Sequence, residues 1–315
     1  MKQPPANPAP RSPGPARDQP PVANWVAPLA LAISMALWGS THPLVKLTLL
    51  EMEAPRVIFL RVLSAAIMLV VLTVLSGKVH LLLAQLRAPL PPLVQGVLGY
   101  SLTMNMSTYA LQYVPAAVNA LLINLSPIFT VFIGAAMLGE SLTRRALLGA
   151  AIGSVGVARV TLSGQDRGGL GHEGLPGVGI GLTAAAIWAL YTVALRKLAH
   201  RTIDPLASTT LAALGACIPL AILANPILAL EQLWSASLTA QVAILWSGSI
   251  ATGGTFVVWA WALARMRASQ VAAFQYLVPP IALLLAWPML GETPSVLLVG
   301  GMALALAGVG FAQRR

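Results

Sequence analysis

Long stretches without a charged residue alternate with short polar segments along most of the chain. The charge-free stretches include 88–139, 232–264 and 268–291, and a helix needs roughly 20 apolar residues to cross the hydrocarbon core of a bilayer. The first of these is too long for one helix, and Tyr113-Val114-Pro115 supplies a break. The pattern predicts ten membrane-spanning helices, over residues 26–48, 55–76, 91–112, 116–138, 144–162, 174–196, 205–224, 238–264, 268–290 and 294–313.

Composition excludes most soluble classes of protein. The 315 residues are 57% hydrophobic and 9% charged, whereas a soluble domain is about one quarter charged. The net charge of +10 is spread in pairs between apolar stretches, so we predict no nucleic-acid partner. A single cysteine, Cys217, excludes a disulfide framework, and no cluster of Cys and His suggests a metal. We predict an all-α integral membrane protein without a cofactor, whose partners are the lipid bilayer and a small-molecule substrate.

The two ends of the chain and its loops indicate an orientation. Eight of the first 21 residues are proline, so residues 1–24 are predicted to be a disordered tail rather than a helix or a signal peptide. If the N-terminus is cytoplasmic, fourteen Lys and Arg lie on the cytoplasmic side and three on the outer side. This bias predicts cytoplasmic N- and C-termini in a plasma (inner) membrane. The oligomeric state stays open.

The sequence repeats itself at a shift of 152. Residues 110–157 match 262–309 without a gap, with 14 identities in 48 positions, including Met-Leu-Gly-Glu at 137–140 and 289–292. Each half holds five predicted helices, and five is odd, so the second copy enters the membrane from the opposite side. The domains are therefore a tail (1–24), a first repeat (25–162), a linker (163–173) and a second repeat (174–315). Inverted repeats of this kind build alternating-access transporters.

These features resemble the EamA-type drug/metabolite transporter superfamily. The resemblance rests on the two five-helix halves, on Trp38-Gly39-Ser40 in the first helix, and on Pro127 and Pro279, each followed by Leu-Gly-Glu. It covers about 25–313. It implies a ten-helix carrier with a central cavity and cytoplasmic termini, and it favours export over uptake. Members of the superfamily carry amino acids, metabolites and drugs, so the resemblance leaves the substrate open.

None of the nine acids lies in the middle of a predicted span, so the sequence offers no obvious coupling carboxylate. Glu140 and Glu292 come closest. Each precedes a hydroxyl residue, Ser141 or Thr293, that we expect to cap the next helix, where a carboxylate gains from the helix dipole. We favour this structural role for both.

Two basic side chains lie within predicted spans: Lys46 in the first and Arg61 in the second. Arg61 is about two turns into its helix; it either pairs with a carbonyl or lines an anion path, and Glu51 and Glu53 of the outer loop are within reach of it. Lys46 is close to the outer surface, and we expect it to snorkel.

The candidate substrate site combines aromatic and polar positions that fall within spans. His42 lies one turn beyond Trp38 and shares its face; it is either a neutral histidine bonded to a carbonyl or a wall of a wet cavity. Asn124 and Tyr276 each lie three residues before a proline, which frees a carbonyl and can open a helix. The mid-span amides of Asn105, Asn124 and Gln275 could instead cross-link helices. The predicted substrate-binding residues are Trp38, His42, Asn105, Asn124, Trp188, Tyr191, Gln275 and Tyr276.

A secondary transporter that exports small metabolites, amino acids or drugs is the function favoured by the repeat and the prolines. A passive channel or receptor is the alternative. A membrane-embedded enzyme is disfavoured because His42 and Cys217 have no obvious catalytic partner. No Gly-rich loop ending in Lys-Ser/Thr is present in the sequence, so it carries no nucleotide-binding motif of that kind.

Overall fold

The structure is a computed structural model that describes residues 25–138, 144–162, 174–265, 271 and 274–313. Every regular element of these residues is helical. The predicted tail (1–24) and linker (163–173) lie outside the described residues, as does Glu140. The all-α expectation is therefore confirmed for the described part of the chain.

Helices fill both halves of the sequence in the same order. The first half contains α1 (Val26–Thr48), α2 (Ala54–Leu75), α3 (Val79–Gln85), α4 (Leu90–Val94), η1 (Gln95–Thr103), α5 (Met104–Ala110), α6 (Ala116–Ile123), α7 (Ser126–Leu138) and α8 (Arg144–Leu162). The second half contains α9 (Leu175–Lys197), η3 (Ala199–Arg201), α10 (Pro205–Ala224), α11 (Pro226–Ser235), α12 (Leu238–Leu245), η4 (Trp246–Gly254), α13 (Thr255–Leu263), η5 (Phe274–Leu277), α15 (Val278–Leu290) and α16 (Val296–Gln313). The short helices α3 and α11 were not predicted.

Several helices have the length and apolarity of membrane spans. Within the described residues, five qualify: Ala54–Leu75, Ala116–Met137, Leu175–Lys197, Pro205–Ala224 and Leu238–Leu263. A sixth span results if Val79–Gln85 and Leu90–Ala110, bent by 87° at their junction, count as one. The chain is thus multi-pass by composition, although these criteria do not reach the ten spans that the sequence predicts.

Each half contains a nine-residue π-helical segment at an equivalent place. η1 interrupts the helix that continues as α5, and η4 interrupts the helix that continues as α13. A π-helix is rare and often marks a functional site. Each segment places a glycine against the other half: a Cβ at Gly96 would lie 2.8 Å from the carbonyl oxygen of Ala212, and one at Gly248 would clash with the carbonyl oxygen of Arg61. These contacts bring the two halves close together.

Proline interrupts the corresponding later helices. The helix predicted over 116–138 is divided at Asn124, which ends α6 before Pro127 enters the first turn of α7. In the second half the 3₁₀ turn η5 precedes Pro279 in α15. A proline cannot supply the backbone donor that a continuous helix needs, so both helices change geometry just before it.

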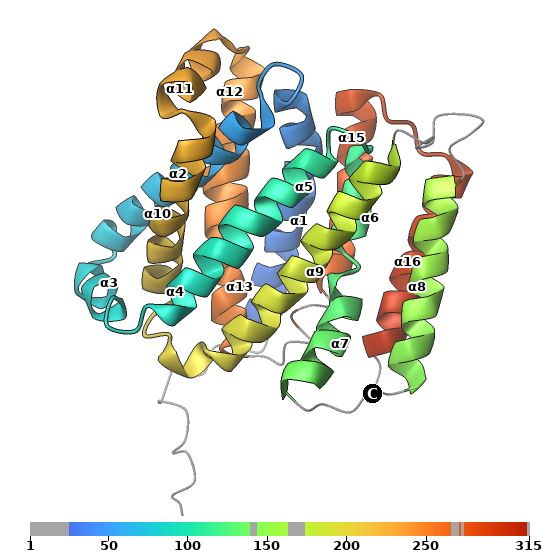
Figure 1. Cartoon of the computed structure of the whole chain (residues 1–315), viewed down its shortest axis with the longest axis horizontal. Helices are drawn as coiled ribbons and strands as arrows, with labels where there is room; N and C mark the ends of the chain where they lie inside the picture. The colour runs from blue at the N-terminus through green and yellow to red at the C-terminus, as the bar shows by residue number, and fades with distance from the viewer. Residues whose placement is uncertain (1–24, 139–143, 163–173, 266–270, 272–273, 314–315) are drawn as a thin grey trace, which may run out of the picture.

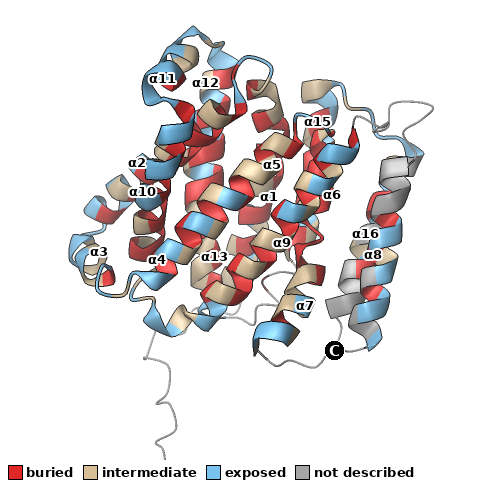
Figure 2. Ribbon diagram, in the orientation of Figure 1, coloured by how far each residue is buried: buried red, intermediate tan, exposed pale blue. Residues whose placement is uncertain are grey.

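The two halves interlock around a common centre (Figure 1). α1 packs against α12, α13 and α15 of the second half, and α9 packs against η1, α5 and α7 of the first half. In this view α6 and α7 descend from the upper edge, whereas α15 rises toward it. Buried faces point to the centre, and α8 and α16 form a separate pair at one side (Figure 2).

The expected role of Glu292 needs correction. α16 begins at Val296, and the Ser295 hydroxyl accepts a hydrogen bond from the N–H of Leu298 at 3.0 Å, so Ser295 rather than Thr293 caps this helix. The carboxylate of Glu292 does lie at a helix N-terminus, but that helix is α6: it accepts from the N–H of Ala116 at 2.9 and 3.0 Å. Sequence proximity suggested the wrong helix because α15, which ends two residues before Glu292, packs against α6.

Candidate functional site

A cavity of about 90 Å³ lies between the two halves. This volume holds several waters and is smaller than a typical pocket for a drug-sized ligand. The first half contributes most of its polar wall, and the second half contributes aromatic and amide side chains. Its lining includes Trp38, Thr41, His42, Arg61, Thr103, Ser107, Thr108, Asn124, Trp188, Thr252, Phe256 and Gln275.

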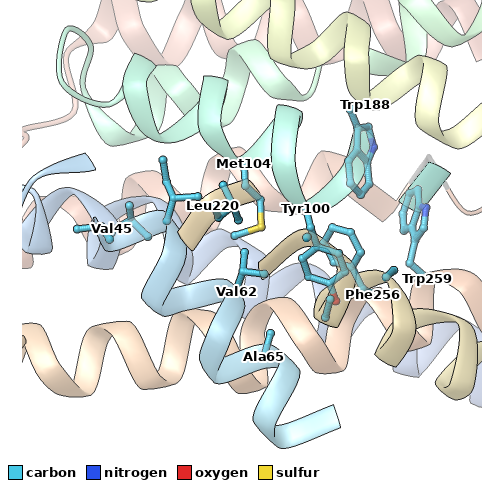
Figure 3. Close-up of a cluster of buried hydrophobic side chains, with 14 of the residues drawn as sticks. Val45, Val62, Ala65, Tyr100, Met104, Trp188, Leu220, Phe256 and Trp259 are labelled. Atoms are coloured by element: carbon cyan, nitrogen blue, oxygen red, sulfur yellow. The ribbon is translucent and has the colours of Figure 1, made fainter. Parts of the chain in front are cut away.

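Aromatic rings from both halves form one wall. The Trp38 ring lies edge-on to Trp188 at 5.0 Å and to Phe256 at 5.8 Å, and it lies 5.6 Å from Trp259. Trp188 and Trp259 are buried, and among the described residues their indole N–H groups have no hydrogen-bond partner. Figure 3 shows Trp188, Phe256 and Trp259 converging with Tyr100. Trp38, Trp188 and Phe256 of this cluster line the cavity and make this wall apolar.

His42 is held by an amide rather than by a carbonyl. Its Nδ1 lies 3.1 Å from Asn119 Nδ2, and the same amide nitrogen lies 3.0 Å from the hydroxyl oxygen of Ser107. With the amide nitrogen as the donor, Nδ1 of His42 is the acceptor of this contact. His42 is buried on the cavity wall. The ring is thus bonded to a side-chain amide, not to the expected carbonyl, and it also lines the cavity.

Among the described residues that line the cavity, Arg61 is the one with a permanent charge. It is 6% exposed, and its Nη atoms reach only the hydroxyls of Thr108 at 3.5 Å and Thr252 at 3.4 Å. The expected outer-loop acids do not approach it: Glu51 accepts from Ser237, and Glu53 pairs with Arg56 at 3.4 Å. The guanidinium therefore faces the cavity with weak partners.

Two amides complete the wall beside the proline breaks. Asn124 donates to the carbonyl of Ala120 at 2.8 Å, which leaves its buried Oδ1 without a partner. Gln275 accepts from the hydroxyl of Ser126 at 3.5 Å across the two halves. Both helices are opened at these residues, so their side chains turn inward.

Three predicted site residues lie away from the cavity wall. Asn105 bonds back to the carbonyl of Ser101 in its own helix. Tyr191 is fully buried behind Trp188, with ring centroids 4.9 Å apart. Tyr276 packs with a second apolar cluster that includes Leu122 and Leu283. The structure thus brings together Trp38, His42, Asn124, Trp188 and Gln275.

Sequence reasoning left the hydroxyls of the wall out of the site. Thr41, Thr103, Ser107, Thr108 and Thr252 line the cavity. Hydroxyls in a helix commonly bond to their own backbone, as Thr41 does to Trp38 at 2.7 Å, so their presence in a span carries no signal. Arg61 did carry a signal in the sequence, because a charged residue inside an apolar run is rare.

An ion pair closes one end of the bundle near the cavity. Lys46 Nζ lies 3.1 Å from Glu292 Oε1 and 2.8 Å from the carbonyl oxygen of Val114. Lys46 therefore does not simply snorkel to the surface. The pair joins α1 of the first half to the segment between α15 and α16 of the second half.

A helical bundle with a partly polar cavity between two similar halves has the architecture of a membrane carrier. Comparison with known families agrees: the EamA-like transporter family matches residues 25–162 and again 175–312. The chain belongs to this family, and it is a multi-pass membrane transporter rather than an enzyme.

Named relatives cover most of the chain. A "Probable terminal-alkyne amino-acid exporter" of Streptantibioticus cattleyicolor is 27% identical, over 91% of this chain and 93% of its own length. A "Probable amino-acid metabolite efflux pump" of Salmonella typhimurium is 28% identical over 70% of this chain and 78% of its own. A solved crystal structure shares the fold with a TM-score of 0.62 and 23% identity, over 92% of this chain and 97% of that one.

Proposed function

We propose that the protein is a secondary transporter that exports small metabolites, with amino acids as the leading class and drugs as a further one. The cavity between the halves is the observation that carries this proposal, because it combines aromatic faces with polar groups that lack protein partners. The two named relatives support export and amino acids. Trp38, His42, Asn124, Trp188 and Gln275 are the proposed substrate contacts.

The transport mechanism that we propose is alternating access between two inverted five-helix repeats with ten spans in total. Three observations support it: the two family matches, the π-helical segments at equivalent places, and the opposite directions of α7 and α15 in Figure 1. In such folds one repeat rocks against the other around a fixed midplane site. The small cavity volume suits a closed state, in which a solute larger than a few atoms needs one side to open.

The contact between Lys46 and Glu292 is the proposed gate at one end. It joins the two halves, and both side chains remain partly exposed, at 27% and 15%. Partial exposure lets water replace the contact when the halves separate, so that the end can open without leaving a buried charge unpaired.

We further propose an inner-membrane location with both termini in the cytoplasm. Single cysteines at Ser12, outside the described residues, and at Gln313, in a chain without Cys217, test this orientation. An impermeant thiol reagent should label both only in permeabilised cells. Labelling of either in intact cells contradicts the topology.

Counterflow in proteoliposomes tests the transporter proposal directly. Vesicles loaded with unlabelled leucine or phenylalanine should accumulate the labelled amino acid from outside, and protein-free vesicles should not. A carrier exchanges solute in this way, whereas a passive channel lets the label equilibrate without accumulation. Equilibration without overshoot, for these amino acids and for a panel of metabolites and drugs, contradicts the proposal and favours the channel.

A further inference from the structure

Arg61 is an unusual feature of the bundle because its charge is buried without an acid. Its side chain is 6% exposed, and no carboxylate lies within ion-pairing distance of it in the part of the chain that the structure describes. Its Nε has no hydrogen-bond partner, and its two hydroxyl contacts are long, at 3.4 and 3.5 Å. A buried charge is normally paired or strongly hydrogen-bonded.

Neighbouring charges do not neutralise it. Lys46 already holds Glu292 at 3.1 Å, and His42 on the same wall carries no negative charge. Within the cavity, Arg61 is therefore surrounded by hydroxyls, a neutral imidazole ring and aromatic faces. A guanidinium in such surroundings attracts an anion from solution, because the cavity lowers the effective dielectric constant around it.

The fold itself does not require an arginine at this place. Gly248 of η4 contacts α2 at the backbone of Arg61, and Gly96 of η1 contacts α10 at the backbone of Ala212. Gly248 lies 152 residues after Gly96, and each glycine touches the backbone of a buried residue of the other half. The contact at position 61 is thus made by the backbone and does not involve the guanidinium of Arg61.

We propose that Arg61 is the anchor for a carboxylate of the transported solute, which places a small organic acid or amino acid in the cavity. A planar guanidinium fork matches a carboxylate with two parallel hydrogen bonds. The apolar body of the solute then lies against Trp38 and Trp188, which line the same cavity. This inference rests on the proposed transport function and specifies its substrate class.

Asn124 adds a preference for a solute that also carries an N–H group. Its Nδ2 is committed to the carbonyl of Ala120 at 2.8 Å, which fixes the orientation of the amide and leaves Oδ1 as a buried acceptor without a donor. An ammonium group supplies such a donor. Arg61 and Asn124 thus supply complementary partners for the two ends of an amino-acid head group.

Matched solutes test the role of the carboxylate. The melting temperature of the purified full-length chain is measured with leucine, phenylalanine, their carboxamides, and sodium chloride at the same ionic strength. We expect leucine and phenylalanine to raise the melting temperature. Their carboxamides should do so at least about tenfold less potently, because they lack the negative charge of the carboxylate. An equal effect of chloride and the acids would instead assign an inorganic anion to Arg61 and overturn the proposal.

Variants at position 61 separate binding from folding. Arg61→Gln should weaken the response to the acids at least about tenfold, and Arg61→Lys should restore it only in part, because it keeps the charge but loses the fork. Arg56→Gln, on the same helix but paired with Glu53, is the matched control and should respond like the wild type.

Arg61→Met should melt no lower than the wild type without solute. A lower melting temperature for Arg61→Met together with unchanged potency for Arg61→Gln would show a structural residue.

Counterflow distinguishes failure of this inference from failure of the transport proposal. Suppose that the wild type exchanges a solute without a carboxylate, that Arg61→Gln does not change this exchange, and that no carboxylate-bearing solute is exchanged. This result overturns the role of Arg61 as the anchor and leaves the transporter proposal intact. Exchange of an acid that Arg61→Gln abolishes supports both.

Discussion

The two halves of the molecule contribute similar helices to the cavity but different side chains. The first half places His42 and Arg61 on the lining, whereas the second half has Thr192 and Leu211 at the positions 150 residues further on. The second half supplies the ring of Phe256, and the tryptophan pair has one member from each half. The charged side chain of the described lining therefore comes from the first half, whereas aromatic rings and uncharged polar groups come from both.

This difference separates packing from function. The features that both halves share are backbone features: a π-helical segment, a glycine pressed against the other half, and a helix opened before a proline. Such features position helices, and a repeat needs them twice. Side chains present in one half only are not required by the shared architecture, so they are the place to look for substrate chemistry.

The largest predicted effect concerns the symmetric tryptophans. Trp188 is 4% exposed, whereas Trp38 is only half-buried. Trp188→Ala should lower the free energy of unfolding by about 3–5 kcal/mol, because truncating a buried side chain leaves an unfilled cavity. Trp38→Ala should lower the free energy of unfolding by less, because this side chain is less buried. Denaturation of both purified variants in the same detergent measures the difference. Equal losses would show that the difference in burial between the two tryptophans does not affect stability.

A smaller effect is predicted where the halves touch. Gly248→Ala should destabilise the protein by about 1–3 kcal/mol, since the added methyl group meets the backbone of α2 and has no room to move. Gly254→Ala, in the same π-helical segment but with no atom within 4 Å of its Cβ, is the control. Melting temperatures compare the two. Because alanine favours a helix more than glycine does, a Gly254→Ala variant that melts as low as Gly248→Ala would mean that the contact between the halves is not the cause of the loss.

Sequence pattern predicted the helices well wherever hydrophobicity alone sets them. The predicted 205–224 coincides with Pro205–Ala224, and the predicted 55–76 differs by one residue from Ala54–Leu75. The short helices α3 and α11 were missed because they lie in the connections between spans, where a search for apolar stretches of span length does not look. The π-helical segments were also missed, because a shift in backbone hydrogen bonding has no signature in apolar periodicity.

The candidate site was predicted in part for similar reasons. Trp38 and His42 share a helix face, and helix geometry alone places both on one wall. Asn105 was misplaced because spacing along a helix does not say whether a polar side chain turns inward or bonds to its own backbone. The pairing of Glu292 with Lys46 spans most of the chain and follows only from the three-dimensional arrangement.

The proposed gate, the ion pair between Lys46 and Glu292, joins the two halves, and its loss should have a milder effect. Glu292→Gln keeps an acceptor for the N–H of Ala116 but loses the charge that attracts Lys46, which should cost about 1–2 kcal/mol at this partly exposed site. A cysteine at Thr41, on the cavity wall, in a chain with Cys217→Ala should then react several-fold faster with an impermeant thiol reagent. Glu53→Gln, which removes the exposed carboxylate that pairs with Arg56 away from the cavity lining, is the control. An unchanged labelling rate would show that this pair does not gate the cavity.

The smallest effect is predicted at the loops that join the halves outside the cavity. The Glu51 carboxylate accepts from the backbone N–H and the hydroxyl of Ser237, each at 2.7 Å, and these bonds hold its pKa below the usual value. A lowered pKa means that the contact stabilises the fold above the pKa of the unfolded chain and loses this effect as pH falls through the folded value. The wild type should therefore lose slightly more stability than Glu51→Gln between pH 6 and about pH 4. Melting curves across this range measure the difference, with Glu231→Gln on the exposed face of α11 as the matched control. If Glu51→Gln and the wild type lose stability in parallel, then the ionised loop contact contributes nothing to holding the two halves together.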